Sequence, residues 1–278
     1  MRSAVTISLV PAARGGPFVF WDDLRAGCKQ AAELGFDAVE VFAPAPEAMK
    51  GLGGLLKEFK LSLAAVGTGA GWLMHRLTLT SPEESVRRKA IDFIHGMIEI
   101  GGDLGAPAII GSMQGRHGEG ASPDQARDWL RAALDDLGEE ARRFQTSLFF
   151  EPLNRYETNL VNTMAAGVEL LQSLQTDNVR LLADLFHMNI EEHDVAAGLQ
   201  AGGWHLGHVH FVDSNRRPVG CGHLHFGPIM AALRETGYQG YLSAEALPWP
   251  DPSAAASRTI RAFRYWTSTV VSTDDTDR

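Results

Sequence analysis

The chain has 278 residues, of which 45% are hydrophobic and 21% are charged, a composition typical of a folded globular protein and not of a disordered chain. Its 34 acidic residues against 25 basic ones give a formal net charge of −9, so its surface should repel phosphate backbones and anionic lipids. We therefore expect neither nucleic acid nor a membrane among its partners. A chain of this length also buries enough surface to fold without a disulfide or a structural metal.

The sequence is typical of a cytoplasmic protein. It has only two cysteines, Cys28 and Cys221, with no CxxC pair, and this usage fits a reducing compartment. The apolar run Ala4–Val10 near the start is too short for a signal peptide and alternates like a strand. No stretch approaches the roughly 20 apolar residues that a membrane span needs.

Short apolar or β-branched runs alternate with longer segments of helical period along the whole chain. In chain order, we predict strand Ala4–Val10, helix Trp21–Leu34, strand Asp37–Phe42, helix Glu47–Phe59, strand Leu61–Val66, helix Pro82–Leu104, strand Pro107–Ile110, helix Pro123–Phe144, strand Ser147–Phe150, helix Thr163–Leu174, strand Val179–Ala183, helix Asp194–Gln200, strand Leu206–Val212, helix Gly227–Thr236, strand Gly240–Ala244 and helix Ser253–Thr269. Ser81 and Ser122 suit the N-cap positions of two of these helices.

Eight strands that are each followed by a helix predict an α/β fold, a single (β/α)₈ TIM barrel. An open doubly wound sheet is the alternative, but it usually has fewer strands, and the even repeat along this chain favours closure. We expect the barrel to be one catalytic domain over residues 1–271, followed by a polar, disordered tail over residues 272–278.

Polar residues stand at the carboxyl ends of the last four predicted strands, where the loops of a barrel converge on its active site. Glu151 follows SLFF, Asp184 follows VRLLA, His210 lies in HLGHVHF, and Glu245 follows YLSA. A single acidic residue at a strand end is more often a helix cap or an ion-pair partner. Four such residues on successive strands favour a shared cation instead. This oxygen-rich set suits Mn²⁺ or Mg²⁺, with Co²⁺ and Zn²⁺ as alternatives.

The segments EPLNRYETN, LLADLFHMN and HVHFVDSNR and the closing SAE carry a resemblance to a known family. They resemble the sugar isomerases and epimerases of the xylose isomerase-like TIM barrel superfamily, and among these most of all the ketose 3-epimerases of the D-tagatose and D-psicose type. The resemblance runs through nearly the whole chain, but its specific motifs lie between residues 150 and 246. It implies that four residues bind one divalent metal ion, namely Glu151, Asp184, His210 and Glu245. It also implies that Glu157, His187 and Arg216 contact substrate hydroxyl groups.

The chemistry expected from this set is proton transfer next to a carbonyl. A divalent metal acts as a Lewis acid and lowers the free energy of the enediolate that forms when the carbon-bound proton is removed. We expect Glu151 and Glu245 to be the acid/base pair. Return of the proton to the opposite face inverts the carbon, whereas its delivery to the adjacent carbon interconverts ketose and aldose.

The sequence departs from the family pattern in the loop after the seventh predicted strand. Relatives commonly have PGxGHxDF there, whereas this chain has PVGCGHLHFG, in which Val219 splits the Pro–Gly pair and His225 replaces the usual aspartate. We expect His208, two residues before His210, to be packed or to support the metal ligands. Other residues could line the mouth of the barrel but are more typical of surface or packing positions: Trp72, His75, Arg116 and His117.

Several other functions share this scaffold, so the substrate stays open. The first alternative is a dehydratase of a cyclitol (inosose) or a hydroxypyruvate isomerase-like enzyme, although the segment ETNLVNT favours the epimerase branch. An apurinic endonuclease-like metallohydrolase would need more metal ligands and a basic groove. A non-catalytic sugar-binding barrel would not need both glutamates. The expected partner is a small sugar or sugar-like substrate, and the assembly is expected to be a homodimer or homotetramer.

Overall fold

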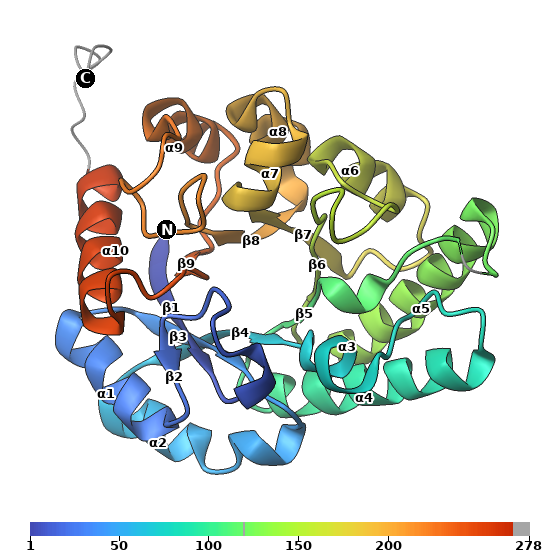
Figure 1. Cartoon of the computed structure of the whole chain (residues 1–278), viewed down its shortest axis with the longest axis horizontal. Coiled ribbons are helices and arrows are strands. Elements are labelled where there is room, and N and C mark those ends of the chain that lie inside the picture. The colour runs from blue at the N-terminus through green and yellow to red at the C-terminus, as the bar shows by residue number, and fades with distance from the viewer. Residues whose placement is uncertain (119, 269–278) are drawn as a thin grey trace.

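The computed structural model describes residues 1–118 and 120–268, and within them the chain forms a closed barrel of parallel strands (Figure 1). In order around the barrel, the strands are β1 (Arg2–Ser8), β3 (Ala38–Phe42), β4 (Ser62–Gly67), β5 (Ala108–Ile110), β6 (Leu148–Phe150), β7 (Val179–Asp184), β8 (Leu206–His210) and β9 (Tyr241–Ala244). Pairing of β9 with residues 2–5 of β1 closes the ring. A two-residue strand, β2 (Phe20–Trp21), pairs with Ile7 and Ser8 at the carboxyl end of β1.

A helix of 8 to 21 residues follows each strand of the ring and covers its outside (Figure 1). These helices are α1 (Leu24–Leu34), α2 (Leu52–Phe59), α4 (Glu84–Gly102), α5 (Pro123–Arg143), α6 (Met164–Gln172), α8 (Val195–Gly202), α9 (Phe226–Glu235) and α10 (Pro252–Thr267). Two short helices, α3 (Ala70–His75) and α7 (Leu185–Glu191), lie in the loops after β4 and β7. The predicted TIM barrel is therefore confirmed. Among the described residues, no helix is long and apolar enough to span a bilayer.

The structure differs from the sequence-based elements mainly at helix starts. Trp21 was expected to begin a helix but belongs to β2, and α1 begins three residues later. Ser81 does not cap α4, because Pro82 and Glu83 stay outside that helix and Glu83 is its N-cap. Ser122 does cap α5, in a reciprocal capping box with Gln125. The predicted domain end at residue 271 and the predicted tail lie outside the described residues.

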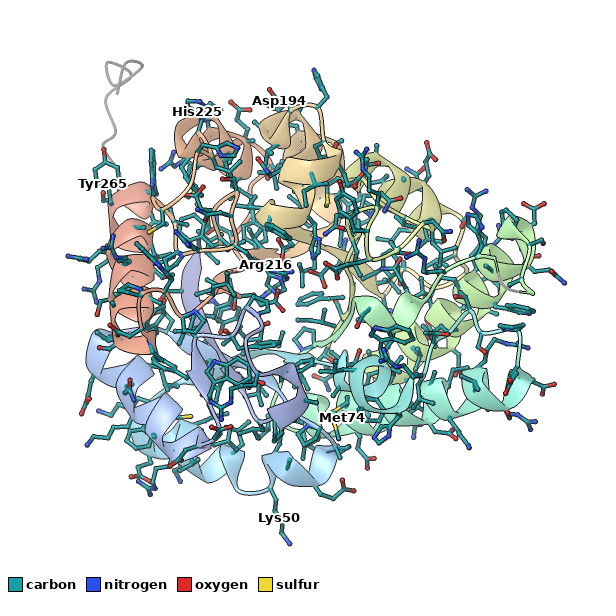
Figure 2. The ribbon with its side chains drawn as sticks, viewed as in Figure 1. Lys50, Met74, Asp194, Arg216, His225 and Tyr265 are labelled. Carbon is teal, nitrogen blue, oxygen red and sulfur yellow. The ribbon has the colours of Figure 1, made fainter. Side chains whose placement is uncertain are left out.

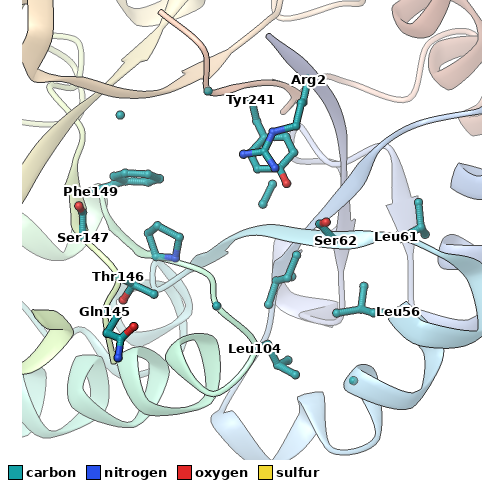
Figure 3. Close-up of a pocket in the computed structure, with 17 residues that line it drawn as sticks. Arg2, Leu56, Leu61, Ser62, Leu104, Gln145, Thr146, Ser147, Phe149 and Tyr241 are labelled. Carbon is teal, nitrogen blue, oxygen red and sulfur yellow. The ribbon is translucent and has the colours of Figure 1, made fainter. Parts of the chain in front are cut away.

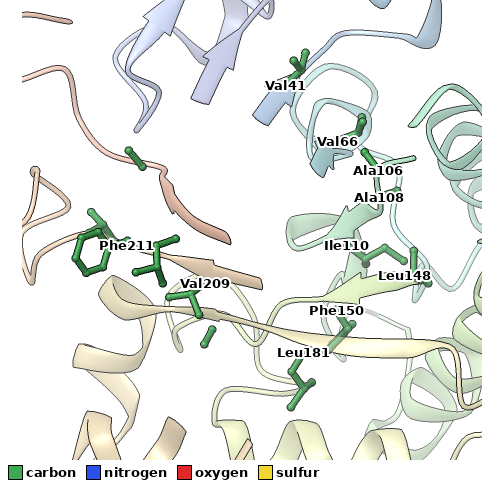
Figure 4. Packing of buried hydrophobic residues seen from close by; sticks show 14 of the residues in the cluster. Val41, Val66, Ala106, Ala108, Ile110, Leu148, Phe150, Leu181, Val209 and Phe211 are labelled. Atoms are coloured by element: carbon green, nitrogen blue, oxygen red, sulfur yellow. The ribbon is translucent and has the colours of Figure 1, made fainter. Parts of the chain in front are cut away.

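The main hydrophobic core lies between the ring of strands and the surrounding helices (Figure 4). Outward-facing strand residues supply the inner wall of this core: Val41, Val66, Ile110, Phe150, Leu181 and Val209. The inside of the barrel holds two small apolar layers of its own. The lower one consists of Ala4, Ala38, Ala64 and Tyr241, and the next of Ala65, Ile109, Phe149 and Leu182. Apolar side chains thus fill the barrel interior towards the amino ends of its strands, and most of the buried acidic and histidine side chains lie towards the carboxyl ends.

The two ends of the barrel have different chemistry. At the amino ends of the strands lies a cavity of about 610 Å³ (Figure 3), where the Arg2 guanidinium stacks over Tyr241 at 3.9 Å from the ring centroid. Among the described residues, its lining contains no aspartate, glutamate or histidine. At the carboxyl ends lies a cavity of about 400 Å³ that is lined by glutamates, histidines and an arginine. Of these two cavities, the second has the carboxylate and imidazole groups that suit proton transfer or the binding of a cation.

Candidate metal centre and active site

Three buried side chains and one half-buried one converge at the carboxyl ends of neighbouring strands, and we call them the four-ligand cluster. They are Glu151 directly after β6, Asp184 at the end of β7, His210 at the end of β8, and the half-buried Glu245 directly after β9. Nδ1 of His210 lies 3.0 Å from Asp184 Oδ2, 3.4 Å from Glu151 Oε1 and 3.5 Å from Glu245 Oε2. One ligand atom from each residue lies within 4.8 Å of the others. The four predicted ligands are therefore brought together.

Asp184 is held in place by the helix that begins next to it. Its Oδ1 accepts hydrogen bonds from the backbone N–H groups of Phe186 (2.7 Å) and His187 (3.1 Å), so it is the N-cap of α7. This leaves Oδ2 free to point at His210. Burial raises the pKa of Asp184, but the nearby His187 and Arg216 outweigh this effect and hold it well below its usual range. Asp184 is therefore an ionised carboxylate with one oxygen facing the cluster.

Arg216 reaches from the loop after β8 to the centre of the barrel mouth (Figure 2). Its guanidinium forms an ion pair with Glu245, lies 3.3 Å from Asp184 Oδ2, and stacks over the Phe186 ring at 4.9 Å from the centroid. The backbone of Arg216 is left-handed, with φ at 58°, and its N–H donates to Asp213 O at 2.8 Å. This conformation costs roughly 1–3 kcal/mol, a strain that folds commonly retain at functional sites.

His187 is fixed by Asn154, the asparagine of the EPLN segment. Nδ1 of His187 accepts from the Asn154 backbone N–H at 3.2 Å and lies 2.7 Å from the side-chain nitrogen of the same residue. Burial lowers the pKa of His187 to about 3, so the ring is neutral at neutral pH. Because Nδ1 is the acceptor, the proton resides on Nε2, which lies 4.0 Å from Glu151 Oε1. His187 thus presents an N–H donor to the cavity.

Glu157 completes the polar side of the cavity. Its Oε1 accepts from the Asn154 side chain at 3.1 Å and lies 3.9 Å from an Arg216 guanidinium nitrogen. The side chain is 42% exposed, whereas the members of the four-ligand cluster are buried or nearly so. Six of the seven predicted site residues therefore line one cavity, and the seventh, the buried Asp184, adjoins it through the four-ligand cluster.

The electrostatics of the cluster fit a cation. Burial raises the pKa of Glu245 to about 8, even though His210 and Arg216 oppose this, and burial also raises the pKa of Glu151. Burial lowers the pKa of His210, but Glu245 and Glu40 outweigh it and raise it well above its ordinary value. Glu151 Oε1 is buried and has no hydrogen-bond partner within the described part of the chain. Carboxylate oxygens that face inward with too few positive partners are the donors that Mn²⁺ and Mg²⁺ take.

The other side of the cavity is apolar. Phe18 stacks on Phe42 with ring centroids 4.6 Å apart, and Trp72 and Leu73 of α3 lie near them along the cavity wall. Of the four further mouth candidates, only Trp72 lines the cavity.

The remaining candidates are held away from it. Arg116 donates to Tyr156 O at 3.4 Å, and the His117 backbone N–H donates to Asn159 Oδ1 at 2.9 Å. His75 is exposed, and His225 lies at the outer edge of the barrel beside α9 (Figure 2).

Sequence reasoning missed two residues at this site. One is Asn154, although it stands in a quoted motif. The other is Glu40 in the middle of β3, whose carboxylate contacts both His208 and His210. The only signal for Glu40 was an acidic residue inside the otherwise apolar run DAVEVF.

Comparison with known proteins now identifies the family. Residues 28–264 match a family described as the xylose isomerase-like TIM barrel. The chain belongs to this family. It is 32% identical over 219 residues to an L-ribulose 3-epimerase from Mesorhizobium japonicum, an alignment that covers 77% of this chain and 72% of that protein.

Two further similarities are informative. A 3-dehydro-D-guloside 4-epimerase from Escherichia coli is 33% identical over 174 residues, or 61% of this chain and 66% of that protein. The crystal structure of a D-allulose 3-epimerase from Methylomonas sp. in complex with D-allulose superposes with a TM-score of 0.80 at 24% identity, covering 95% of this chain and 98% of that chain. The curated relatives are thus sugar epimerases, and the fold is theirs.

Proposed function

We propose that this protein is a divalent-metal-dependent sugar epimerase of the ketose 3-epimerase type. It removes a proton next to a ketose carbonyl and returns one to the opposite face of the same carbon, through an enediolate. The observation that carries this proposal is the four-ligand cluster, in which two glutamates flank His210 Nδ1 at 3.4 and 3.5 Å. A set that could hold a cation and that contains two glutamates fits this two-base chemistry. The similarity to curated epimerases supports the same reaction.

The ligands in this proposal are the four members of the cluster: Glu151, Asp184, His210 and Glu245. A bound Mn²⁺ or Mg²⁺ ion would supply Lewis-acid stabilisation of the negative charge that develops on the substrate oxygens. Glu151 and Glu245 are the acid/base pair, and each such proton transfer contributes about 10²- to 10⁴-fold to the rate.

The remaining polar groups orient the substrate. His187 Nε2–H and the Arg216 guanidinium donate hydrogen bonds to substrate oxygens, and Glu157 accepts one from a hydroxyl group. The apolar side formed by Phe18, Phe42 and Trp72 packs against the C–H face of the sugar. Such packing excludes water from the reacting carbon and strengthens the electrostatic interactions around it.

The proposal is tested with the Mn²⁺-loaded protein and a panel of substrates, with products identified by NMR. The panel consists of L-ribulose, D-psicose and D-tagatose as ketoses, their aldose counterparts, an inosose and hydroxypyruvate. We expect interconversion of C3 epimers for at least one ketose and no loss of water from the inosose. Dehydration of the inosose or isomerisation of hydroxypyruvate, with every ketose unchanged, would instead support the corresponding alternative.

A second candidate is epimerisation of a keto-glycoside at C4. It is favoured by the 33% identity to the E. coli 4-epimerase and by an apolar wall that could accept a group attached to the sugar. A 3-keto-glucoside therefore belongs in the same panel. Faster turnover of this compound than of any free ketose would favour the second candidate, whereas the leading proposal expects the reverse.

A further inference from the structure

Glu40 is an acidic residue in the interior of the barrel, where an unpaired charge is costly. It lies in the middle of β3, is 4% exposed, and pairs in register with Thr6 of β1 and Ala65 of β4. Ala65 itself belongs to an apolar layer. Burying an ionised carboxylate in such surroundings is strongly unfavourable unless hydrogen bonds or opposite charges compensate. The groups that hydrogen-bond to the Glu40 carboxylate therefore indicate its role.

Both carboxylate oxygens of Glu40 face histidines of β8. Oε2 lies 2.8 Å from Nε2 of His208, and Oε1 lies 3.3 Å from Nε2 of His210. The two imidazole rings are nearly perpendicular, with an interplanar angle of 88°, so each presents its ring edge to a different oxygen. Since an ionised carboxylate only accepts hydrogen bonds, both Nε2 atoms are donors.

This arrangement determines which nitrogen of His210 is available to a cation. When the neutral ring carries its proton on Nε2, the lone pair is on Nδ1. Nδ1 is the atom that faces the carboxylates of Asp184, Glu151 and Glu245. Without Glu40, a neutral His210 could carry its proton on Nδ1 instead and donate it to Asp184, which would close the site to a metal.

His208 is the third member of this network. It is fully buried, and its ring stacks on Phe149 with centroids 5.5 Å apart. No other residue that the structure describes forms a hydrogen bond with its Nδ1. His208 therefore uses its single polar contact to fix the second oxygen of Glu40. This limits rotation of the carboxylate and keeps Oε1 directed at His210.

We propose that Glu40 is a positioning residue that fixes the tautomer and orientation of His210 as a metal ligand, with His208 as its anchor. The inference rests on the proposed metal site. Carboxylate–histidine–metal arrangements are a general way to orient an imidazole ligand, and loss of the carboxylate typically costs about 10- to 100-fold in metal affinity or activity.

The same three residues also have the composition of a second cation site, because their ligand atoms lie within 4.8 Å of one another. Two ions would then have to share His210, one on each nitrogen, and this requires an imidazolate. A hydrogen-bonded carboxylate needs no such species. The stoichiometry of metal binding separates the two arrangements, because we expect one ion per chain.

The test measures Mn²⁺ binding from the EPR signal of free Mn²⁺, in the wild type and in Glu40→Gln. Glutamine has the same shape but is a weaker, uncharged acceptor, so we expect one ion per chain in both proteins and about 10- to 100-fold weaker binding in the variant. Glu40→Asp keeps the charge and should lose less, which also serves if Glu40→Gln does not fold. Ser243→Ala is the matched control, because Ser243 is also buried in a barrel strand and its hydroxyl group has no partner.

A second readout addresses the tautomer directly. In the Mg²⁺-loaded protein, ¹⁵N chemical shifts should identify Nε2 of His210 as protonated in the wild type and give a mixed or inverted pattern in Glu40→Gln. Unchanged Mn²⁺ affinity in Glu40→Gln, or two ions bound per chain, would overturn the proposed role of Glu40 but not the metal site. Failure of the wild-type protein to bind Mn²⁺ would overturn the metal site itself, and this inference with it.

Discussion

Nδ1 of His210 lies 3.0 Å from Oδ2 of Asp184, while Oδ1 of the same aspartate caps helix α7. Asp184 thus belongs to both the fold and the cluster, because Oδ1 caps α7 and Oδ2 faces the candidate metal position. Because the capping hydrogen bonds fix the orientation of the Asp184 carboxylate, its Oδ2 stays directed at His210. When the His210 ring is doubly protonated, its Nδ1 proton therefore faces the carboxylates of the cluster.

Mn²⁺ binding should release protons and should strengthen as the pH rises. The surrounding carboxylates raise the pKa of His210 well above its ordinary value despite burial, so the ion-free ring is protonated at pH 7 and must lose a proton to bind metal. Below that pKa, affinity should rise up to about tenfold per pH unit for the proton released.

Calorimetric titration with Mn²⁺ at pH 7, in buffers of different ionisation enthalpy, measures the number of protons released. We expect at least one per ion. A heat of binding that is the same in all buffers would contradict the assignment of His210 as a protonated ligand.

Asn154→Ala should impair substrate binding without affecting the metal. The change removes the amide group that contacts His187 Nδ1 at 2.7 Å and so loosens the ring that presents Nε2–H to the cavity. Steady-state kinetics should show a loss of about tenfold in kcat/KM, the worth of one hydrogen bond, with Mn²⁺ affinity unchanged. Asn159→Ala is the control, because Asn159 lies in the same loop but contacts His117 instead. Equal kinetics for the two variants would remove Asn154 from this role.

Gly111→Ala should disturb the cluster without replacing any ligand. A Cβ atom at this position would lie 2.5 Å from Glu151 Oε2, so the carboxylate has to move. A displacement of about 1 Å in a catalytic group can cost roughly 10²-fold in rate, and we expect a loss of that order together with weaker Mn²⁺ binding. The control is Gly54→Ala in α2, where a Cβ meets nothing within 4 Å. Wild-type Mn²⁺ affinity in Gly111→Ala would show that the Glu151 position is not needed.

His225→Asp should stabilise the fold. His225 is the N-cap of α9 but its side chain makes no capping hydrogen bond, whereas an aspartate would accept one and also favour the positive end of the helix. We expect a gain of about 0.5–1 kcal/mol in the free energy of unfolding, measured with urea. The reverse comparison is Asp194→Ala in α8, which removes an existing cap and should lose about 1 kcal/mol. No gain in His225→Asp, alongside a loss in Asp194→Ala, would mean that the α9 terminus cannot accept a cap.

The barrel was predictable because each strand is a short apolar run bounded by a turn or a helix. The predicted strand 37–42, for example, differs from β3 by one residue. Helices α3 and α7 escaped prediction because six or seven residues are too few to show a helical period. Asp184 and Glu245 were identifiable as site candidates because barrel topology brings the ends of their strands together.

Glu40 was not identifiable in this way. An acidic residue within a strand is consistent with a side chain that faces solvent, and its partners lie about 170 positions further along the chain. Only the closed barrel brings β3 and β8 to the two sides of the same interior. The assignment of roles within the cluster is likewise a proposal, because strand order predicts proximity and not chemistry.

The most direct test of the proposed function is solvent deuterium exchange at the carbon next to the ketose carbonyl, followed by NMR in D₂O with the Mn²⁺-loaded protein. We expect deuterium to enter C3 of the ketose that is turned over, in both epimers. Glu151→Gln and Glu245→Gln should each abolish this exchange while leaving the fold intact, because each removes one of the two proton-transfer groups. Epimerisation without deuterium incorporation, or exchange retained in either variant, would contradict the account.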